Sequence, residues 1–415
     1  MPPICALYIG GMLAKVHGTA AIPERVTPDK PVIRLLPIMG AVLIAFLVIG
    51  LALPVLPLHV HDGLRLNTFV VGLVTGSQFG ASLISRVWAG RYSDGAGPKS
   101  AVLAGLMAAV FSGALYLASL AFAGAPSLSV SILLLGRALL GAAESFIITG
   151  AITWGLALAG PSNAGRVIAW MGMAMFAALA FGAPVGTELY ATGGFVAVAS
   201  ATAIIPLVAM LMVAPLAKVA PRHGSQAGIL TVVRAVWMPG LGSALSSIGF
   251  GALISFSSLL AVRREWSPVW LPFSAFALAL VAARLFFGHL PDKLGGAKVA
   301  LVSIVIEAIG LALLGAAWDR NMGTLGAALT GMGYALVYPG LGVEAVGRAP
   351  PESRGLGMGA YTVFLDVALG FGSPVLGLIA GWAGLGAVFS ASAVAVLAAA
   401  GIAVRLLVTS HKGAM

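Results

Sequence analysis

Long apolar runs separated by short polar breaks constrain this sequence more than any other feature. A helix needs about 20 apolar residues to cross the core of a bilayer, and the chain offers one such run after another. Only 9% of its 415 residues are charged, against about 25% in soluble domains, so a water-soluble fold could not cover its surface. The runs lack the alternation typical of an outer-membrane barrel. The sequence therefore predicts an all-α polytopic membrane protein.

We predict twelve transmembrane helices, arranged as two six-helix bundles. The longest polar break, from Lys218 to Arg234, separates the two groups of six. The predicted spans are 35–58, 68–90, 100–123, 129–155, 166–190, 194–216, 235–261, 268–289, 299–318, 323–346, 355–379 and 384–408. This gives an N-terminal tail (1–34), an N-terminal bundle (35–217), a central loop (218–234), a C-terminal bundle (235–408) and a C-terminal tail (409–415).

The basic residues predict the orientation of the chain. With the N-terminus inside, most of the 23 Lys and Arg residues fall on the cytoplasmic side, as the positive-inside rule requires. The opposite side holds only Arg65, Arg263, Arg264 and Arg320. Both tails and the central loop are then cytoplasmic, and the net charge of +10 is explained without a nucleic-acid partner. We expect a monomer in the inner membrane of a bacterium, with the lipid bilayer, a small-molecule substrate and protons as its partners.

The two halves contain a related stretch. "SRVWAGRYSDGAGPKSAVL" begins at Ser85 and "ARLFFGHLPDKLGGAKVAL" at Ala283, and they align without gaps at an offset of 198. A weaker echo links "FGAPVG" from Phe181 with "FGSPVLG" from Phe371. Parallel repeats of this kind place a pseudo-two-fold axis along the membrane normal.

We interpret the repeated polar stretch as a gate at the cytoplasmic face. The first Gly is expected to end a helix, the Asp to lie in a tight turn facing a helix N-terminus, and the second Gly to adopt a positive φ. Neighbouring cations can exchange partners there without entering lipid. The predicted gate residues are Gly90, Arg91, Asp94, Gly97, Lys99 and Arg86 in the first copy, and Gly288, Asp292, Lys293, Gly295 and Arg284 in the second.

These two stretches resemble the two copies of motif A of the major facilitator superfamily. "GRALLG", with Arg137 and Gly141, is similar to its motif B, and the region after span one is most like the drug:proton antiporter-like branch, YhhS/YfcJ type. Gly95 and Pro98 stand where motif A usually has basic residues. The resemblance implies a central cavity, alternating access, and an Asp94 that closes the cytoplasmic side against the start of span eleven. It also implies proton transfer by Arg137.

Ionisable residues inside the spans are candidates for proton coupling or substrate contact. Asp366 lies near the middle of span eleven and Glu144 in span four, where each carboxyl could exchange a proton as it moves between apolar and aqueous surroundings. The alternative for Asp366 is a structural hydrogen bond, and for Arg137 a packing anchor on backbone carbonyls. Gln78 is a further candidate for the cavity.

Other polar and small residues receive structural interpretations. Arg86 and Arg284 can brace the gate or contact substrate, with bracing favoured. Glu307 is expected to have a structural partner, and Glu344 to pair with Arg348 one turn later. Gly72, Gly76 and Gly80 predict close helix packing. Pro184 and Pro374 are expected to bend their helices.

The favoured function is proton-coupled efflux of a small organic compound by a secondary transporter. Proton-coupled uptake of a sugar or organic acid is the alternative, and a membrane enzyme or sensor is the alternative of a different class. We expect no enzyme activity, no cofactor and no metal site, because the sequence contains no nucleotide-binding, zinc or nucleophile motif.

Overall fold

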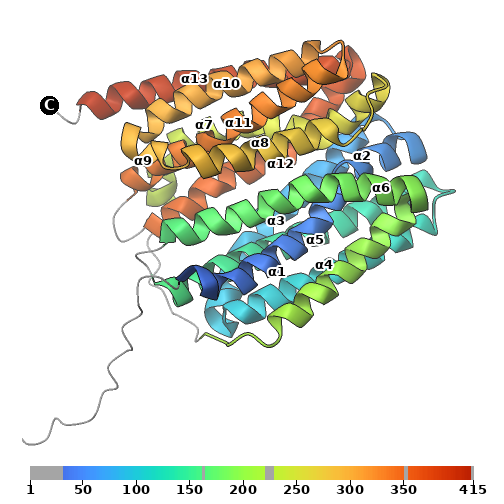
Figure 1. Ribbon diagram of the computed structural model, residues 1–415, viewed down its shortest axis with the longest axis horizontal. Coiled ribbons are helices and arrows are strands. Elements are labelled where there is room, and N and C mark those ends of the chain that lie inside the picture. The colour runs from blue at the N-terminus through green and yellow to red at the C-terminus, as the bar shows by residue number, and fades with distance from the viewer. Residues whose placement is uncertain (1–30, 161–163, 220–228, 350–353, 413–415) are drawn as a thin grey trace, which may run out of the picture.

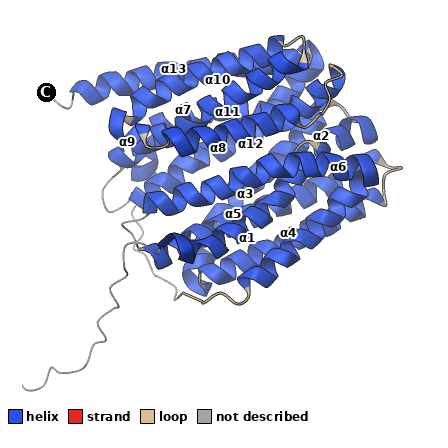
Figure 2. Cartoon of the chain, viewed as in Figure 1, coloured by secondary structure: helices blue, strands red, loops and turns tan. Residues whose placement is uncertain are grey.

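The computed structural model describes residues 31–160, 164–219, 229–349 and 354–412, and these residues form helices without any strand (Figure 2). The first half contains α1 (Pro31–Ala52), α2 (Val55–Leu58), the π-helix η1 (His59–Gly63), α3 (Thr68–Ala96), α4 (Pro98–Leu120), α5 (Pro126–Ala159) and α6 (Ala164–Val213). The second contains α7 (Ile229–Arg263), α8 (Leu271–Phe287), α9 (Leu290–Leu294), α10 (Gly296–Ala316), α11 (Arg320–Arg348), α12 (Arg354–Ala383) and α13 (Leu385–Lys412). The all-α prediction is confirmed.

Helix α6 carries two of the predicted spans. Its 50 residues would extend about 75 Å as one helix, far more than a bilayer core of about 30 Å. Gly194 breaks it with φ 63° and ψ −165°, and the ribbon of α6 reverses its direction (Figure 1). In the described part of the chain, nine helices are long and apolar enough to cross a membrane, and α8 is a shorter apolar helix. Twelve crossings therefore remain a prediction.

The helices form two groups that repeat the same packing. In the first, α1 packs on α6, α3 on α5, and α4 on α5. In the second, α7 packs on α12 and α13, α8 on α11, and α10 on α11. Figure 1 shows the first group in blue to lime-green beside the second in yellow to red. The groups meet where α3 packs on α12, α6 on α8, and α2 on α7.

The turns of the repeated polar stretch are built alike. Gly97 has φ 90° between α3 and α4, and Gly295 has φ 93° between α9 and α10, so the predicted positive φ is confirmed in both copies. The prediction that Gly90 ends a helix is wrong. Helix α3 continues to Ala96, because nothing in "RYSDGA" stops a helix, whereas Pro98 moves the residue before it out of the helical region.

Several predicted boundaries shift by a few residues. Helix α1 begins at Pro31, inside the predicted tail, and α7 begins at Ile229, inside the predicted central loop. The apolar stretch "ILTVV" lets the helix start early despite Arg234. Residues 1–30, 220–228 and 413–415 of these predicted segments lie outside the described residues.

Candidate functional site

An ion pair joins the two halves. Arg86 on α3 donates from Nε and Nη2 to Oδ2 of Asp366 on α12, at 2.9 and 2.6 Å. The Asp366 side chain is only 3% exposed, while that of Arg86 is 23% exposed. A carboxylate buried this deeply needs a cation beside it, because unpaired burial of the charge is costly. The sequence placed these two residues in separate roles, and the structure brings them together.

Close helix packing makes this contact possible. A Cβ added at Gly72 would collide with the backbone of Ser373, and one at Gly76 would lie 3.1 Å from Cδ of Pro374. Thr68 also donates a hydrogen bond to the carbonyl of Gly377 at 2.8 Å. The predicted role of these glycines in close packing is confirmed at Gly72 and Gly76, whereas Gly80 has free space at its Cβ position.

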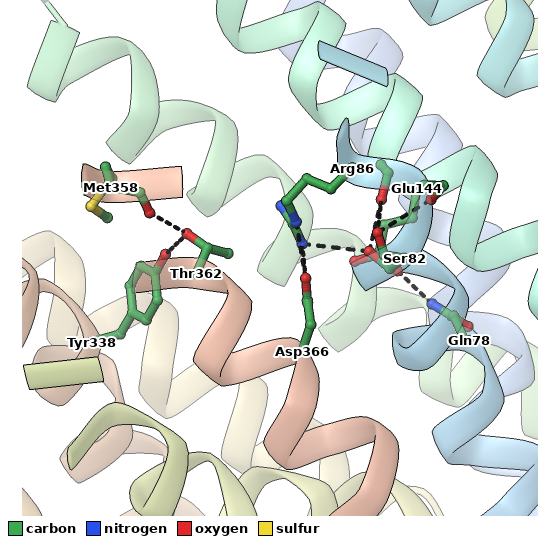
Figure 3. A network of polar contacts seen from close by, with 10 residues as sticks. Gln78, Ser82, Arg86, Glu144, Tyr338, Met358, Thr362 and Asp366 are labelled. Atoms are coloured by element: carbon green, nitrogen blue, oxygen red, sulfur yellow. Dashed lines mark hydrogen bonds and ion pairs between the residues drawn. The ribbon is translucent and has the colours of Figure 1, made fainter. Parts of the chain in front are cut away.

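A second carboxyl lies beside the pair within the first half. Gln78 Nε2 donates to Oε2 of Glu144 at 2.7 Å. Ser82 Oγ accepts a 3.4 Å bond from Arg86 Nη2 and lies 2.8 Å from Ser145 Oγ. Figure 3 shows this group facing Asp366. Glu144 is close enough to both Arg86 and Asp366 to interact with their charges.

The spacing in the sequence explains how these side chains gather. Gln78, Ser82 and Arg86 recur every four residues, so they share one face of α3. Helix α5 approaches that face closely, because Gly141 lies against the backbone of Gln78. The recurrence of polar residues every four positions was the signal that could have revealed Ser82 and the role of Arg86 before the structure was known.

Hydroxyl groups of the second half face the same region. Tyr338 on α11 and Thr362 on α12 share a 2.7 Å hydrogen bond, and Tyr361 donates to the carbonyl of Tyr338 at 2.8 Å. Tyr338 is close enough to Arg86, Asp366 and Arg284 to interact with their charges. None of these three hydroxyl residues was a sequence candidate, because Tyr and Thr are common in helices without a functional role.

The second arginine has a different environment. Arg284 on α8 donates from Nε to the carbonyl of Ala335 at 3.2 Å. Its guanidinium carbon lies 4.8 Å from the centre of the Phe176 ring on α6. Its side chain is partly exposed, and no described carboxylate forms an ion pair with it.

Arg137 is fully buried at 0% exposure. Its Nε donates to the carbonyl of Val74 at 3.3 Å and its Nη1 to the Tyr116 hydroxyl at 3.4 Å. These contacts agree with the alternative interpretation, in which Arg137 anchors the packing of its helix. Proton transfer by Arg137 stays a prediction.

The predicted gate residues divide into exposed and buried ones. Arg91 and Asp94 in the last turn of α3, and Asp292 and Lys293 in α9, are exposed. Asp94 lies in a helix and not in the predicted tight turn. No described residue forms an ion pair or hydrogen bond with its carboxylate, and residues 350–353 before α12 lie outside the described ranges. The closing contact of Asp94 stays a prediction.

Lys99 is bonded to two backbone carbonyls, and the predicted exchange of its partners stays a prediction. Its Nζ donates to the carbonyls of Ala214 and Leu216 at 2.6 and 2.7 Å, and the residue is 8% exposed. It thereby ties the start of α4 to the carbonyls that follow α6.

The structural partners expected for Glu344 and Glu307 are observed. Glu344 pairs with Arg348 at 3.6 Å, and the buried Glu307 accepts a 2.6 Å bond from Ser246. Gly288 directly follows the end of α8. Pro184 and Pro374 lie inside α6 and α12, and the bends expected there stay predictions.

Comparison with known proteins links this arrangement to transporters. The sequence profile of the Major Facilitator Superfamily matches residues 38–273 and 240–414. An uncharacterized MFS-type transporter of Salmonella typhimurium is 40% identical over 385 residues, covering 93% of this chain and 99% of its own. One from Burkholderia mallei is 40% identical over 388 residues, covering 92% and 94%.

Solved structures agree in fold. The human organic anion transporter TETRAN superposes with a TM-score of 0.67 at 17% identity, covering 91% of this chain and 100% of its own. A bacterial homologue of the lysosomal transporter Spinster, in an inward-facing conformation, gives 0.64 at 13% identity, covering 92% and 96%. The E. coli fucose:proton symporter gives 0.64 at 14% identity, covering 91% and 99%.

Proposed function

The chain belongs to the major facilitator superfamily, and from that premise we propose that it is a proton-coupled secondary transporter of a small organic compound. The observation that carries this proposal is the Arg86–Asp366 pair, which crosses the boundary between the two halves. A rocking motion of one half against the other would have to break or rebuild this contact.

Proton coupling follows from the chemistry of that contact. While Arg86 lies against it, Asp366 is stabilised as a carboxylate. When the halves separate, the buried carboxyl loses its cation, and taking up a proton removes the cost of an unpaired charge. Glu144, hydrogen-bonded to Gln78, is a second, partly buried carboxyl in this region and would receive or pass on that proton. Protonation and the facing state of the molecule are thereby linked.

The contacts between the halves also support alternating access. Thr68 and Gly72 at the start of α3 pack tightly on the end of α12, and the predicted topology places these ends on the outer side. The exposed Asp94 lies at the other end of α3. We infer a conformation closed on the outer side, with the Asp94 contact formed only in the opposite state.

We propose efflux in exchange for protons as the direction, since the sequence resembles the drug:proton antiporter-like branch. Uptake together with protons is the second candidate, favoured by the partly exposed Arg284, which could bind an organic acid. We place the protein in the inner membrane of a bacterium with both termini cytoplasmic, since this orientation agrees with its basic loops.

The test uses purified protein in liposomes that contain a trapped pH-sensitive dye. Organic acids, sugars and cationic drugs are added one at a time, and we expect at least one to change the internal pH. Acidification during its entry indicates symport, and alkalinisation indicates antiport. Asp366→Asn should abolish this proton flux but retain exchange of labelled compound for unlabelled compound. A wild-type protein that transports a compound without any proton flux would contradict coupling.

A further inference from the structure

The two contact surfaces between the halves are related by the internal repeat. On one surface Gly76 of α3 lies against the carbonyl of Gly370 on α12. On the other, Ser274 of α8 donates to the carbonyl of Ala180 on α6 at 3.1 Å. Ser274 follows Gly76 by 198 positions, the offset of the repeated polar stretch, and Gly370 follows Ala180 by 190, the offset between "FGAPVG" and "FGSPVLG". Adding 198 to the α3 residue and subtracting 190 from the α12 residue therefore converts a contact on the first surface into a contact on the second.

The same offsets show that the two surfaces differ at the position of the Arg86–Asp366 ion pair. Arg86 corresponds to Arg284, and Asp366 corresponds to Phe176. The corresponding residues do meet, because the Arg284 guanidinium lies over the Phe176 ring at 4.8 Å. One surface thus has a cation on a carboxylate, and the other has a cation on an aromatic ring at the equivalent place.

Arg284 is left with a charge that no described residue neutralises. A guanidinium stays protonated in proteins, and a cation–π contact offsets only part of the cost of removing it from water. Of its donors, Nε is used by the carbonyl of Ala335, whereas no hydrogen bond to a described residue occupies Nη1 or Nη2. A Cβ at Gly172 would lie 3.2 Å from Nη1, so this glycine leaves room beside the guanidinium.

We propose that Arg284 binds the carboxylate of an organic anion, and that this anion class is the transported substrate. The free Nη groups fit the two oxygens of a carboxylate. The Phe176 ring and the neighbouring Tyr338 offer contacts for an apolar or aromatic remainder. The anion replaces the carboxylate that Asp366 supplies on the related surface. This inference rests on the proposed transport function, because it identifies the cargo.

The test measures binding by the thermal unfolding of the purified full-length protein in detergent. Three probes share one ring and differ in charge: benzoate, benzyl alcohol and benzylamine. A ligand that binds the folded state raises the melting temperature. We expect benzoate to raise it by a few degrees in a concentration-dependent way, and the other two probes to have no comparable effect.

Substitutions test whether benzoate binds at Arg284. Arg284→Gln should weaken benzoate binding about tenfold or more, since charge-assisted hydrogen bonds are lost, while Arg284→Lys should retain part of it. Phe176→Asp should also abolish binding, because it provides Arg284 with an internal carboxylate. Arg263→Gln, at an exposed position, removes the same charge elsewhere and should leave binding unchanged.

Each contrary outcome overturns the proposal. These are stabilisation by benzylamine in preference to benzoate, no stabilisation of the wild type by any probe, or an undiminished benzoate effect in Phe176→Asp. The assay needs no membrane and no proton gradient. Anion binding can therefore fail while proton-coupled transport holds, and proton coupling can fail while anion binding holds.

Discussion

At the scale of single residues, the Arg86–Asp366 pair makes a thermodynamic prediction. Arg86→Gln leaves the nearly fully buried carboxylate without its cation, and we expect a loss of about 3–5 kcal/mol of stability. Adding Asp366→Asn removes the stranded charge, so the double variant should recover most of that loss. Thermal unfolding of the four proteins measures this coupling. A double variant whose losses simply add would show that the two side chains act independently.

Lys99 offers a second prediction at this scale. Its ammonium group donates hydrogen bonds to two carbonyls that follow α6. Lys99→Met removes the donor of both hydrogen bonds. We expect a loss of about 1.5–3 kcal/mol, the range for hydrogen bonds to a charged group. Lys298→Met, at an exposed position in α10, should change the melting temperature little. Equal effects of the two substitutions would contradict a structural role for Lys99.

Which residues carry charge inside the spans was predictable from the sequence, but their partners were not. Arg86 and Asp366 are 280 positions apart, and nothing in a sequence of apolar helices sets how far one antiparallel helix slides along another. A shift of one turn would have paired Arg86 with a different face of α12. Likewise, the position of Arg137 in its span did not show that Val74 and Tyr116 would be its partners.

At the scale of helices, the contact between α3 and α12 can be tested with a matched pair of glycines. Gly76→Ala places a methyl group against Gly370 and Pro374, at a cost of about 1–3 kcal/mol for overpacking. Because this contact lies at the ends predicted to face outward, we expect those ends to separate and transport to fall. Gly80→Ala, with free space at its Cβ position, should do neither. Spin-label distances between the outer ends of α3 and α12 report the change.

Secondary-structure type and the approximate positions of the helices were the most predictable level. Apolar runs of the right length fixed where helices lie, and errors were confined to their ends, such as the continuation of α3 beyond Gly90. Helix ends depend on local groups such as Pro98, whose effect extends only one residue back. A glycine does not require a helix to end, because glycine inside a helix costs only about 1 kcal/mol relative to alanine.

At the scale of the whole molecule, a substitution of Asp94 tests the proposed conformation that is closed on the cytoplasmic side. Its carboxylate is exposed and unpaired among the described residues, so Asp94→Asn should change stability here by less than about 0.5 kcal/mol. If Asp94 closes the cytoplasmic side, the same substitution should still reduce transport several-fold, and Asp292→Asn should have a smaller effect. Transport rates and melting temperatures measured on the same preparations separate the effect of the substitution on transport from its effect on stability. Normal transport by Asp94→Asn would exclude the gate.

The break at Gly194 also bears on how the chain enters the membrane during synthesis. Only one residue of α6 departs from helical geometry, and a single residue spans at most about 3.6 Å. The segments on either side therefore cannot be released into lipid as independent helices that later find each other. We therefore expect them to be inserted as one helical hairpin, without an extended loop between them that a protease could cut. The order of biogenesis is thus partly fixed by one glycine.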